Sequence, residues 1–304
     1  MFTSNFTSRV ITPASQGQPI VVAGPMHFFI HIFLLHPAIL NSFAAITQVA
    51  LGVLILWKRT TKIGLLGSMG WGLFVWWIGE GFGGLFGWHT LMLMGAPGAA
   101  LIYVILAIAV FPKESKKNDN KENQNPAYWL AFVWALFWII GAIYQLLPGQ
   151  NSVSDVSSMV ARNGLRQPGW LASLDSHVGS FINRLGAPTT SMANMHMTAN
   201  QMARMQTQSG ANYWFILLVA SIQILIGLSV FATRYIRNTG IALGVIASLI
   251  FWVIGQSFGG IFTGLGTDPN SAILFIVLAI AILGCNNLSQ KLSSFYGRIE
   301  RAII

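Results

Sequence analysis

The sequence predicts an all-α fold, a polytopic bundle of about seven transmembrane helices built on a parallel internal repeat. Three observations predict it. The chain is 54% hydrophobic and 8% charged, whereas soluble domains are about 25% charged. Its apolar residues gather in stretches long enough to cross a bilayer, and its two halves share sequence at many ordered points.

A helix of about 20 apolar residues spans the hydrocarbon core of a bilayer. Seven apolar stretches of the sequence are long enough to form such a helix. Eleven Trp and twenty Phe suit the aromatic belts of such a protein. The stretches cover residues 38–57, 63–82, 92–111, 127–147, 212–232, 240–259 and 270–286.

Basic residues cluster in alternate connections between these stretches. The connections after the first, third and fifth, together with the C-terminal tail, hold most of the 17 Lys and Arg residues and every lysine. The positive-inside rule places such segments in the cytoplasm. We therefore expect a multi-pass protein of the cell membrane, with its N-terminus outside and its C-terminus cytoplasmic. The net charge of +9 arises from these clusters, so the expected partner is the lipid bilayer and not nucleic acid.

The internal repeat is clearest at two aromatic, glycine-rich segments. FVWWIGEGFGGLF at 74–86 matches IFWVIGQSFGGIF at 250–262, and the match continues from 96–111 to 268–283. Further upstream, QGQP resembles LRQP. The copies begin four predicted spans apart, which is an even number, so we expect both to have the same orientation, related by an axis along the membrane normal.

The repeat predicts three parts of the chain. Residues 1–111 form the first membrane repeat, 112–126 a charged cytoplasmic linker, and 127–304 the second repeat, whose long outer loop covers 148–211. The second copy has a leading helix that the first copy lacks. This 4+4 pattern without its first helix predicts either a helix upstream of Met1 or the loss of one.

Glu80 is the one acidic residue within an apolar stretch, and a charge at membrane depth is by default functional. A structural alternative places it near the outer interface, capping the GFGG turn. Its counterpart is Gln256, and Gln48 and Gln223 also occupy equivalent positions. These four residues form the predicted binding set, although the Gln48 and Gln223 pair equally suits hydrogen bonding between helices.

The paired glycines of both copies predict helix breaks that expose backbone to a solute, or else close helix packing. The segment from Thr267 to Ser271 predicts a helix start, with Asp268 as the N-cap and Pro269 in the first turn.

Methionine and histidine are concentrated on the predicted outer side. If 192–205 is helical, Met192, Met195, His196 and Met202 share one arc, a soft ligand set suited to Cu(I). An amphipathic interfacial helix explains the same pattern without a metal. His27 and His31, spaced i and i+4, share one face and are a second candidate pair of ligands.

No residue is predicted to be catalytic, and whether the protein is an enzyme stays open. The single cysteine, Cys285, excludes an intrachain disulfide framework. The sequence contains no P-loop, GxSxG elbow or HExxH motif.

The segments MFTSNF, QGQPIVVAGP, WWIGEGFGGLF, GAPGAALIY and QPGWLASLD resemble a family of uncharacterised bacterial multi-pass integral membrane proteins. The similarity extends over nearly the whole chain, and GEGFGGLF and QPGWLA are its most distinctive motifs. The resemblance implies a membrane fold and a helix ahead of MFTS, and it contributes no catalytic residues because the family has no established activity. Gln256 and Ser257 depart from the acidic motif, which weakens any twofold-symmetric role for the acid.

Three functions compete at this point. The first is a transporter of a small molecule or ion, with its site between the two repeats. The second is a non-catalytic membrane subunit or scaffold whose outer loop docks another membrane subunit or a second copy of itself. The third is extracytoplasmic copper handling through the Met/His segment.

Overall fold

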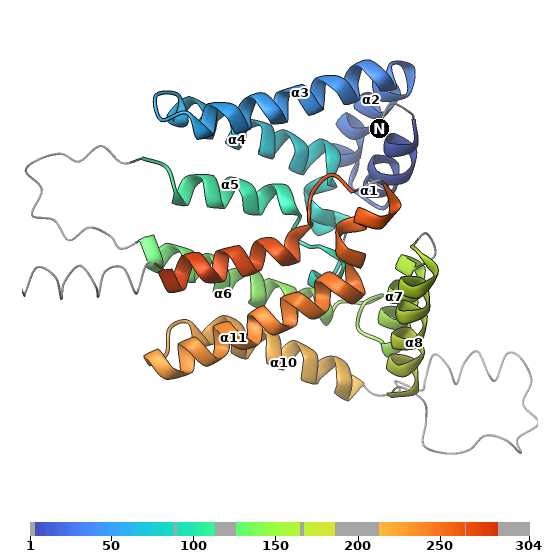
Figure 1. Ribbon diagram of the computed structural model, residues 1–304. Coiled ribbons are helices and arrows are strands. Elements are labelled where there is room, and N and C mark those ends of the chain that lie inside the picture. The colour runs from blue at the N-terminus through green and yellow to red at the C-terminus, as the bar shows by residue number, and fades with distance from the viewer. Residues whose placement is uncertain are drawn as a thin grey trace, which may run out of the picture.

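The computed structural model describes residues 4–87, 90–112, 126–164, 167–185, 213–264 and 266–284. Throughout these ranges every regular element is a helix, which confirms the all-α prediction. Figure 1 shows most of the longer helices running side by side across the molecule, while α7 and α8 pack against their ends.

The described first half of the chain contains five short helical segments of 3 to 7 residues and four longer helices. In chain order these are η1 (Thr7–Ile11), α1 (Thr12–Ser15), α2 (Ile20–Leu35), α3 (Pro37–Leu56), α4 (Thr61–Phe74), η2 (Val75–Gly79), η3 (Gly81–Gly87), η4 (Met92–Met94) and α5 (Ala99–Ala109).

The second half begins with α6 and repeats the pattern of a long helix that ends in a short irregular one. Its elements are α6 (Pro126–Gln145), α7 (Val153–Gly164), α8 (Gly169–Leu185), α10 (Tyr213–Ser229), α11 (Arg234–Ile250), η5 (Phe251–Gly255), η6 (Ser257–Thr263) and the helix Ser271–Gly284.

Local sequence explains where α3 begins and how it turns into α4. Pro37 occupies the first turn of α3, where its missing N–H costs no helical hydrogen bond. At the other end, the hydroxyl of Thr60 donates to the carbonyl of Leu54 at 2.9 Å. The hydroxyl of Thr61 donates to Ile55 at 3.0 Å. Two carbonyls that the end of the helix leaves unpaired are satisfied in this way.

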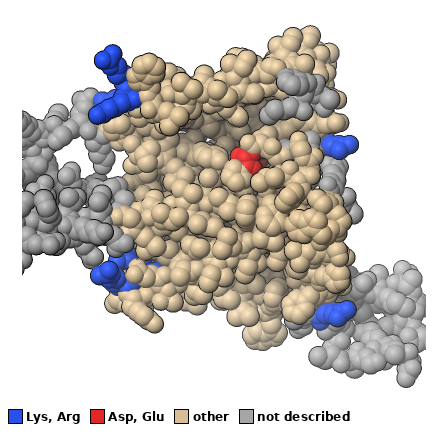
Figure 2. Space-filling model, in the orientation of Figure 1, with Lys and Arg blue, Asp and Glu red and all other residues tan. Residues whose placement is uncertain are grey.

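Two helical stretches in the described part are long and apolar enough to cross a membrane, Pro37–Leu56 and Arg234–Thr263. Shorter apolar helices lie in the other predicted spans, including Ala99–Ala109, Trp129–Gln145, Tyr213–Ser229 and Ser271–Gly284. A membrane location is compatible with these lengths. Figure 2 shows Lys and Arg side chains at the two ends of the visible face, with a surface between them that is uncharged apart from one acidic patch.

α4 and α11 run in the same direction through the molecule. In Figure 1 the α3–α4 turn and the α10–α11 turn lie at the same edge, and both helices then run toward the side that carries α1, α7 and α8. α4 and α11 therefore end on the same side of the molecule, and the glycine-rich segments at their ends lie there as well.

α6 joins the two halves through one core. Its Trp134 and Trp138 are 0% exposed, and the Trp138 ring lies 6.2 Å from that of Phe275 in the last helix. The same core includes Ile102 of α5 and Ile226 of α10. Aromatic pairs of this kind contribute about 0.5–1.5 kcal/mol each beyond their buried area, so α6 fixes the two halves against each other.

Candidate functional site

Two kinks with the same backbone shape end α4 and α11. Each helix passes through one π-helical turn, η2 or η5, and then into a left-handed turn. The φ angles of Phe82, Gly83 and Gly84 are 57°, 64° and 76°. Those of Phe258, Gly259 and Gly260 are 58°, 67° and 71°.

The sequence explains why the chain can turn here. Glycine adopts positive φ at no steric cost. It occupies three of the four left-handed positions in the first kink and two of the four in the second, where Ser257 has a φ of 43°. Both kinks also contain a phenylalanine, for which this conformation is unfavourable. Packing offsets that cost, because the ring of Phe82 lies 4.7 Å from Trp76 and that of Phe258 lies 4.9 Å from Trp252.

The same tryptophans tie each kink to the loop before the next helix. The indole N–H of Trp76 donates to the carbonyl of Pro97 at 2.7 Å. The indole N–H of Trp252 donates to Pro269 at 2.9 Å. Each kink is thus fastened to the start of a following helix, α5 in one case and Ser271–Gly284 in the other.

Glu80 and Gln256 complete this connection. The backbone N–H of Ala100 donates to both carboxylate oxygens of Glu80, at 3.2 and 3.3 Å. The N–H of Ala272 donates to Gln256 Oε1 at 3.1 Å. Both side chains therefore accept hydrogen bonds from the first turn of a helix, where unpaired N–H groups favour an oxygen acceptor and, for Glu80, a negative charge.

Gln256 also joins the two halves of the chain. Its side-chain amide donates to the carbonyl of Met92 at 3.2 Å and to the hydroxyl of Ser271 at 3.2 Å. A glutamate at this position would have no N–H to donate. The difference between Glu80 and Gln256 therefore has a local structural cause.

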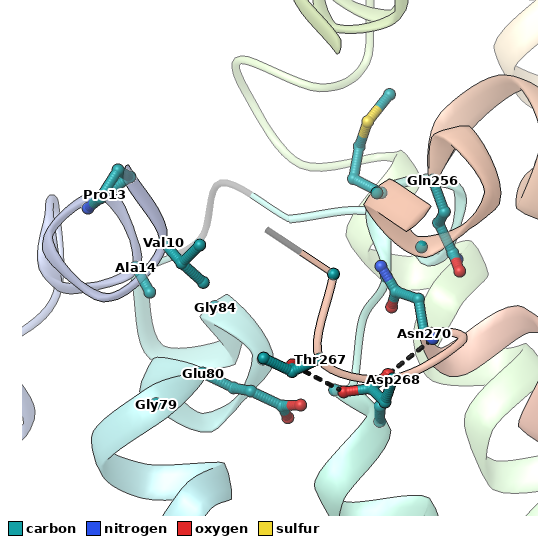
Figure 3. Close-up of a pocket in the computed structure, with 18 of the residues that line it drawn as sticks. Val10, Pro13, Ala14, Gly79, Glu80, Gly84, Gln256, Thr267, Asp268 and Asn270 are labelled. Carbon is teal, nitrogen blue, oxygen red and sulfur yellow. Dashed lines mark hydrogen bonds between the residues drawn. The ribbon is translucent and has the colours of Figure 1, made fainter. Parts of the chain in front are cut away.

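A cavity of about 740 Å³ lies between the two kinks, in the size range of ligand sites. Its lining includes Gly83 and Gly84 of the first kink and Gly259 and Gly260 of the second. Glu80, Gln256, Asp268 and Asn270 also line it, and Figure 3 shows these four side chains around the same space. Elements from both halves of the chain thus form one polar cavity.

Four charged side chains line the cavity, two of each sign: Arg9, Glu80, Arg162 and Asp268. In the part of the chain that the structure describes, none of the four forms an ion pair with another side chain. Loss of contact with water raises the pKa of Asp268, while hydrogen bonds from the Asn270 backbone and from Thr267 act in the opposite direction. The cavity therefore presents unpaired charges of both signs.

The structure brings together two of the predicted binding residues, Glu80 and Gln256. The other two lie away from the cavity: Gln48 is exposed on α3, and Gln223 is 4% exposed on α10. An added Cβ at Gly141 of α6 would lie 3.2 Å from Gln223 Oε1. α6 thus covers Gln223 on α10, while Gln48 stays open on α3.

The predicted metal ligands are only partly described. His27 and His31 are both exposed on α2. Met192, Met195, His196 and Met202 lie outside the described residues, so the copper prediction stays a prediction. Within the ranges that are described, no group of three or more His, Cys, Asp or Glu residues is placed to hold a metal.

Sequence reasoning missed three charged residues of the cavity. Asp268 was expected to be a helix N-cap. Instead the helix starts at Ser271, and Asp268 accepts a hydrogen bond from the N–H of Asn270 at 2.6 Å. Arg9 and Arg162 belong to segments without a distinctive motif. The match between the loops at 96–99 and 268–271 was the available signal for Asp268, because each loop follows a kink.

A buried carboxyl lies beside the second kink. Asp175 of α8 is 0% exposed. Its Oδ2 accepts a hydrogen bond from Ser257 at 3.3 Å, and its Oδ1 has no partner. Burial raises the pKa of Asp175 to about 6, although the Ser257 hydrogen bond acts in the opposite direction. Protonation removes a buried charge that has a single polar contact.

We therefore expect acidification to stabilise the folded chain between about pH 7 and pH 4. The folded state binds a proton at Asp175 more tightly than the unfolded state does, because the folded pKa exceeds the ordinary value of 3.8. The gain begins as the pH falls through 6 and is complete below the unfolded pKa. Thermal unfolding of the purified protein at pH 4 to 7.5 measures it, with Asp175→Asn as the reference that subtracts other titrating groups. If the thermal midpoints of the unmodified protein and of Asp175→Asn changed equally with pH, Asp175 would not be the group responsible.

Comparison with models of protein families, with curated proteins and with solved structures found no match to this chain.

Proposed function

We propose that this chain is a multi-pass membrane protein that binds and transports a small polar solute in the cavity between its two kinks. Seven apolar helices cross the bilayer in this proposal, with the N-terminus outside and the C-terminus in the cytoplasm. The two halves are parallel repeats related by an axis along the membrane normal. The observation that carries it is the cavity of about 740 Å³ lined by both kinks.

The membrane part of the proposal is supported by the surface of the molecule. Large apolar side chains are exposed on most of the long helices, such as Phe43 at 60%, Leu225 at 66% and Ile280 at 63%. Soluble monomers rarely expose continuous apolar patches larger than a few hundred Å². Lipid is the solvent in which these side chains are stable.

The repeat is supported by the matched kinks. Equivalent residues have φ angles within a few degrees of each other. Equivalent tryptophans donate to equivalent proline carbonyls. Glu80 and Gln256 each accept a hydrogen bond from the following helix. Agreement in backbone, hydrogen bonds and sequence together favours duplication over coincidence.

The transport part is supported by the position of the cavity at the ends of interrupted helices. Membrane transporters place substrates where helices break, because freed backbone groups and helix termini bind polar solutes there. In this chain two breaks face one cavity, and Glu80 contributes a carboxylate beside it. An acidic residue within an apolar stretch is by default part of a solute or ion path.

A bulky side chain in the cavity tests the proposal. Thr267 lines the cavity from an exposed loop, so Thr267→Trp fills space without replacing a core residue. Thermal shift of the purified protein against pools of polar solutes first identifies a ligand, and uptake of that ligand into proteoliposomes follows. We expect Thr267→Trp to weaken binding and uptake at least about tenfold.

Thr239→Trp is the matched control, because Thr239 is exposed near the start of α11 and lies away from the cavity lining. It should bind and transport like the unmodified protein. Undiminished binding by the Thr267 variant would overturn the proposed site.

A further inference from the structure

We propose that the solute is a small zwitterion that carries an ammonium and a carboxylate group, of the amino-acid or short-peptide class. This inference rests on the proposed function, since it assigns a ligand class to the same cavity. The observation behind it is that two cations and two anions line one cavity without pairing with one another.

The acidic side of the cavity is formed by Glu80 and Asp268. Figure 3 shows the Glu80 side chain pointing toward the loop that carries Asp268, with Thr267 beside both. Both carboxyl groups line the same cavity. Both residues are partly buried, so solvent screens their negative charge less than it would at the surface. A bound ammonium group would offset that charge and donate up to three hydrogen bonds.

The basic side is formed by Arg162 of α7 and Arg9 of η1. Arg162 is held in place by Ser158, to whose carbonyl its Nε donates at 3.1 Å and to whose hydroxyl its Nη2 donates at 3.0 Å. A guanidinium has five N–H donors in a planar fork that matches a carboxylate, so these two bonds leave donors for a ligand.

The basic and acidic side chains of the cavity differ in their exposure to solvent. Arg9 and Arg162 are exposed, whereas Glu80 and Asp268 are partly buried. The arginines are therefore the groups an incoming solute meets from solvent, and the carboxylates are the groups it reaches farther in. A zwitterion satisfies both sides when its ammonium group enters first.

Other ligand classes fit less well. A simple anion would approach two carboxylates. A metal ion would find two carboxylates, of which Glu80 already accepts two hydrogen bonds. Sugars are commonly held against aromatic rings, and the described lining residues include a single aromatic side chain, that of Phe6. A ligand with both charges uses all four charged side chains.

Ligands with one charge removed test the inference. The purified full-length protein is titrated with pools of free amino acids and dipeptides. Matched pools are N-acetylated, which removes the positive charge, or amidated, which removes the negative charge. Sorbitol, inorganic phosphate and calcium chloride represent the competing classes. Zwitterion pools should bind, and each single-charge pool should bind at least about tenfold more weakly, because a charge-assisted hydrogen bond is lost.

A charge-matched variant makes the test specific. Arg162→Gln should weaken binding of the zwitterion and of the acetylated ligand at least about tenfold, and should leave the amidated ligand unchanged because that ligand has no carboxylate. Arg184→Gln in α8 is the control, since Arg184 is exposed but does not line the cavity. It should leave all three affinities unchanged.

The outcomes separate this inference from the proposed function. Sorbitol, phosphate or calcium binding that Thr267→Trp abolishes, without zwitterion binding, would overturn the ligand class and leave the cavity as the site. Equal affinity for zwitterionic, acetylated and amidated ligands would do the same. If no solute binds in a manner sensitive to Thr267→Trp, both proposals fail.

Discussion

Gly83→Ala is expected to remove most of the correctly folded protein. Gly83 has a φ of +64°, and an added Cβ would lie 2.6 Å from the backbone nitrogen of Gly98 and closer still to the carbonyl group of Pro97. All three contacts are with backbone atoms of the loop that leads into α5, which no side-chain rotation can relieve. Overpacking and a left-handed alanine together cost at least about 3 kcal/mol, a large part of the stability of an ordinary domain.

Gly70→Ala in α4 is the control for this prediction. An added Cβ at Gly70 meets nothing within 4 Å, and alanine inside a helix is favoured over glycine by about 0.5–1 kcal/mol. The yield of monodisperse protein after detergent extraction and the thermal midpoint measure both variants. Gly259→Ala should be intermediate, because its nearest contacts are 2.8 Å away. Equal behaviour of the Gly83 and Gly70 variants would show that the first kink is not needed for folding.

The helices within the predicted spans and the kinks could be predicted from the sequence because their causes are local, whereas α2, α7 and α8 lie outside those spans and were not predicted. Apolar stretches mark the helices, and GFGG marks the end of α4. The sequence match between 74–86 and 250–262 added the second kink, which has φ angles close to those of the first. Each feature depends on residues that are neighbours along the chain.

The cavity could not be predicted completely because it depends on distant contacts. Glu80 lies beside Asp268 only after the two halves pack against each other, and no local pattern encodes that approach. The Asp268 loop predicted a helix start from its own sequence. In the structure Gln256 instead supplies the acceptor for the new helix from the preceding kink.

The burial of Gln48 and Gln223 also could not be predicted from the sequence. They occupy equivalent positions in the sequence, yet one is exposed and the other is 4% exposed. The difference comes from α6, which covers Gln223 on α10 and leaves Gln48 on α3 open. Matching sequence predicts a matching backbone, whereas the neighbouring helices decide how far each side chain is buried.

The second large effect is expected for Glu80→Gln, which should keep the fold and lose the solute. Glutamine can accept the hydrogen bond from Ala100, as Gln256 does from Ala272 at the second kink. The cost to folding is then about 0.3–1 kcal/mol, the value of a negative charge at a helix N-terminus. The carboxylate that faces the cavity is lost, and a charged hydrogen bond to a ligand is worth about 1.5–3 kcal/mol, so affinity should fall about 10- to 150-fold.

Gln256→Glu tests whether the loss of binding in Glu80→Gln is specific to Glu80 or would follow any substitution in a kink. A glutamate there cannot donate to Met92 or Ser271, so two hydrogen bonds worth about 0.5–1.5 kcal/mol each are lost. It also buries a negative charge where a neutral amide is 5% exposed. We therefore expect this variant to lower the thermal midpoint strongly, and Glu80→Gln to lower it little. If Glu80→Gln bound the solute with unchanged affinity, Glu80 would serve only to hold the start of α5. If it failed to fold, the equivalence of the two kinks would be wrong. The two substitutions are the reverse of each other, Glu to Gln at position 80 and Gln to Glu at position 256. A difference between their effects on folding and on binding therefore depends on the hydrogen-bond donors of Gln256 and on the charge of Glu80.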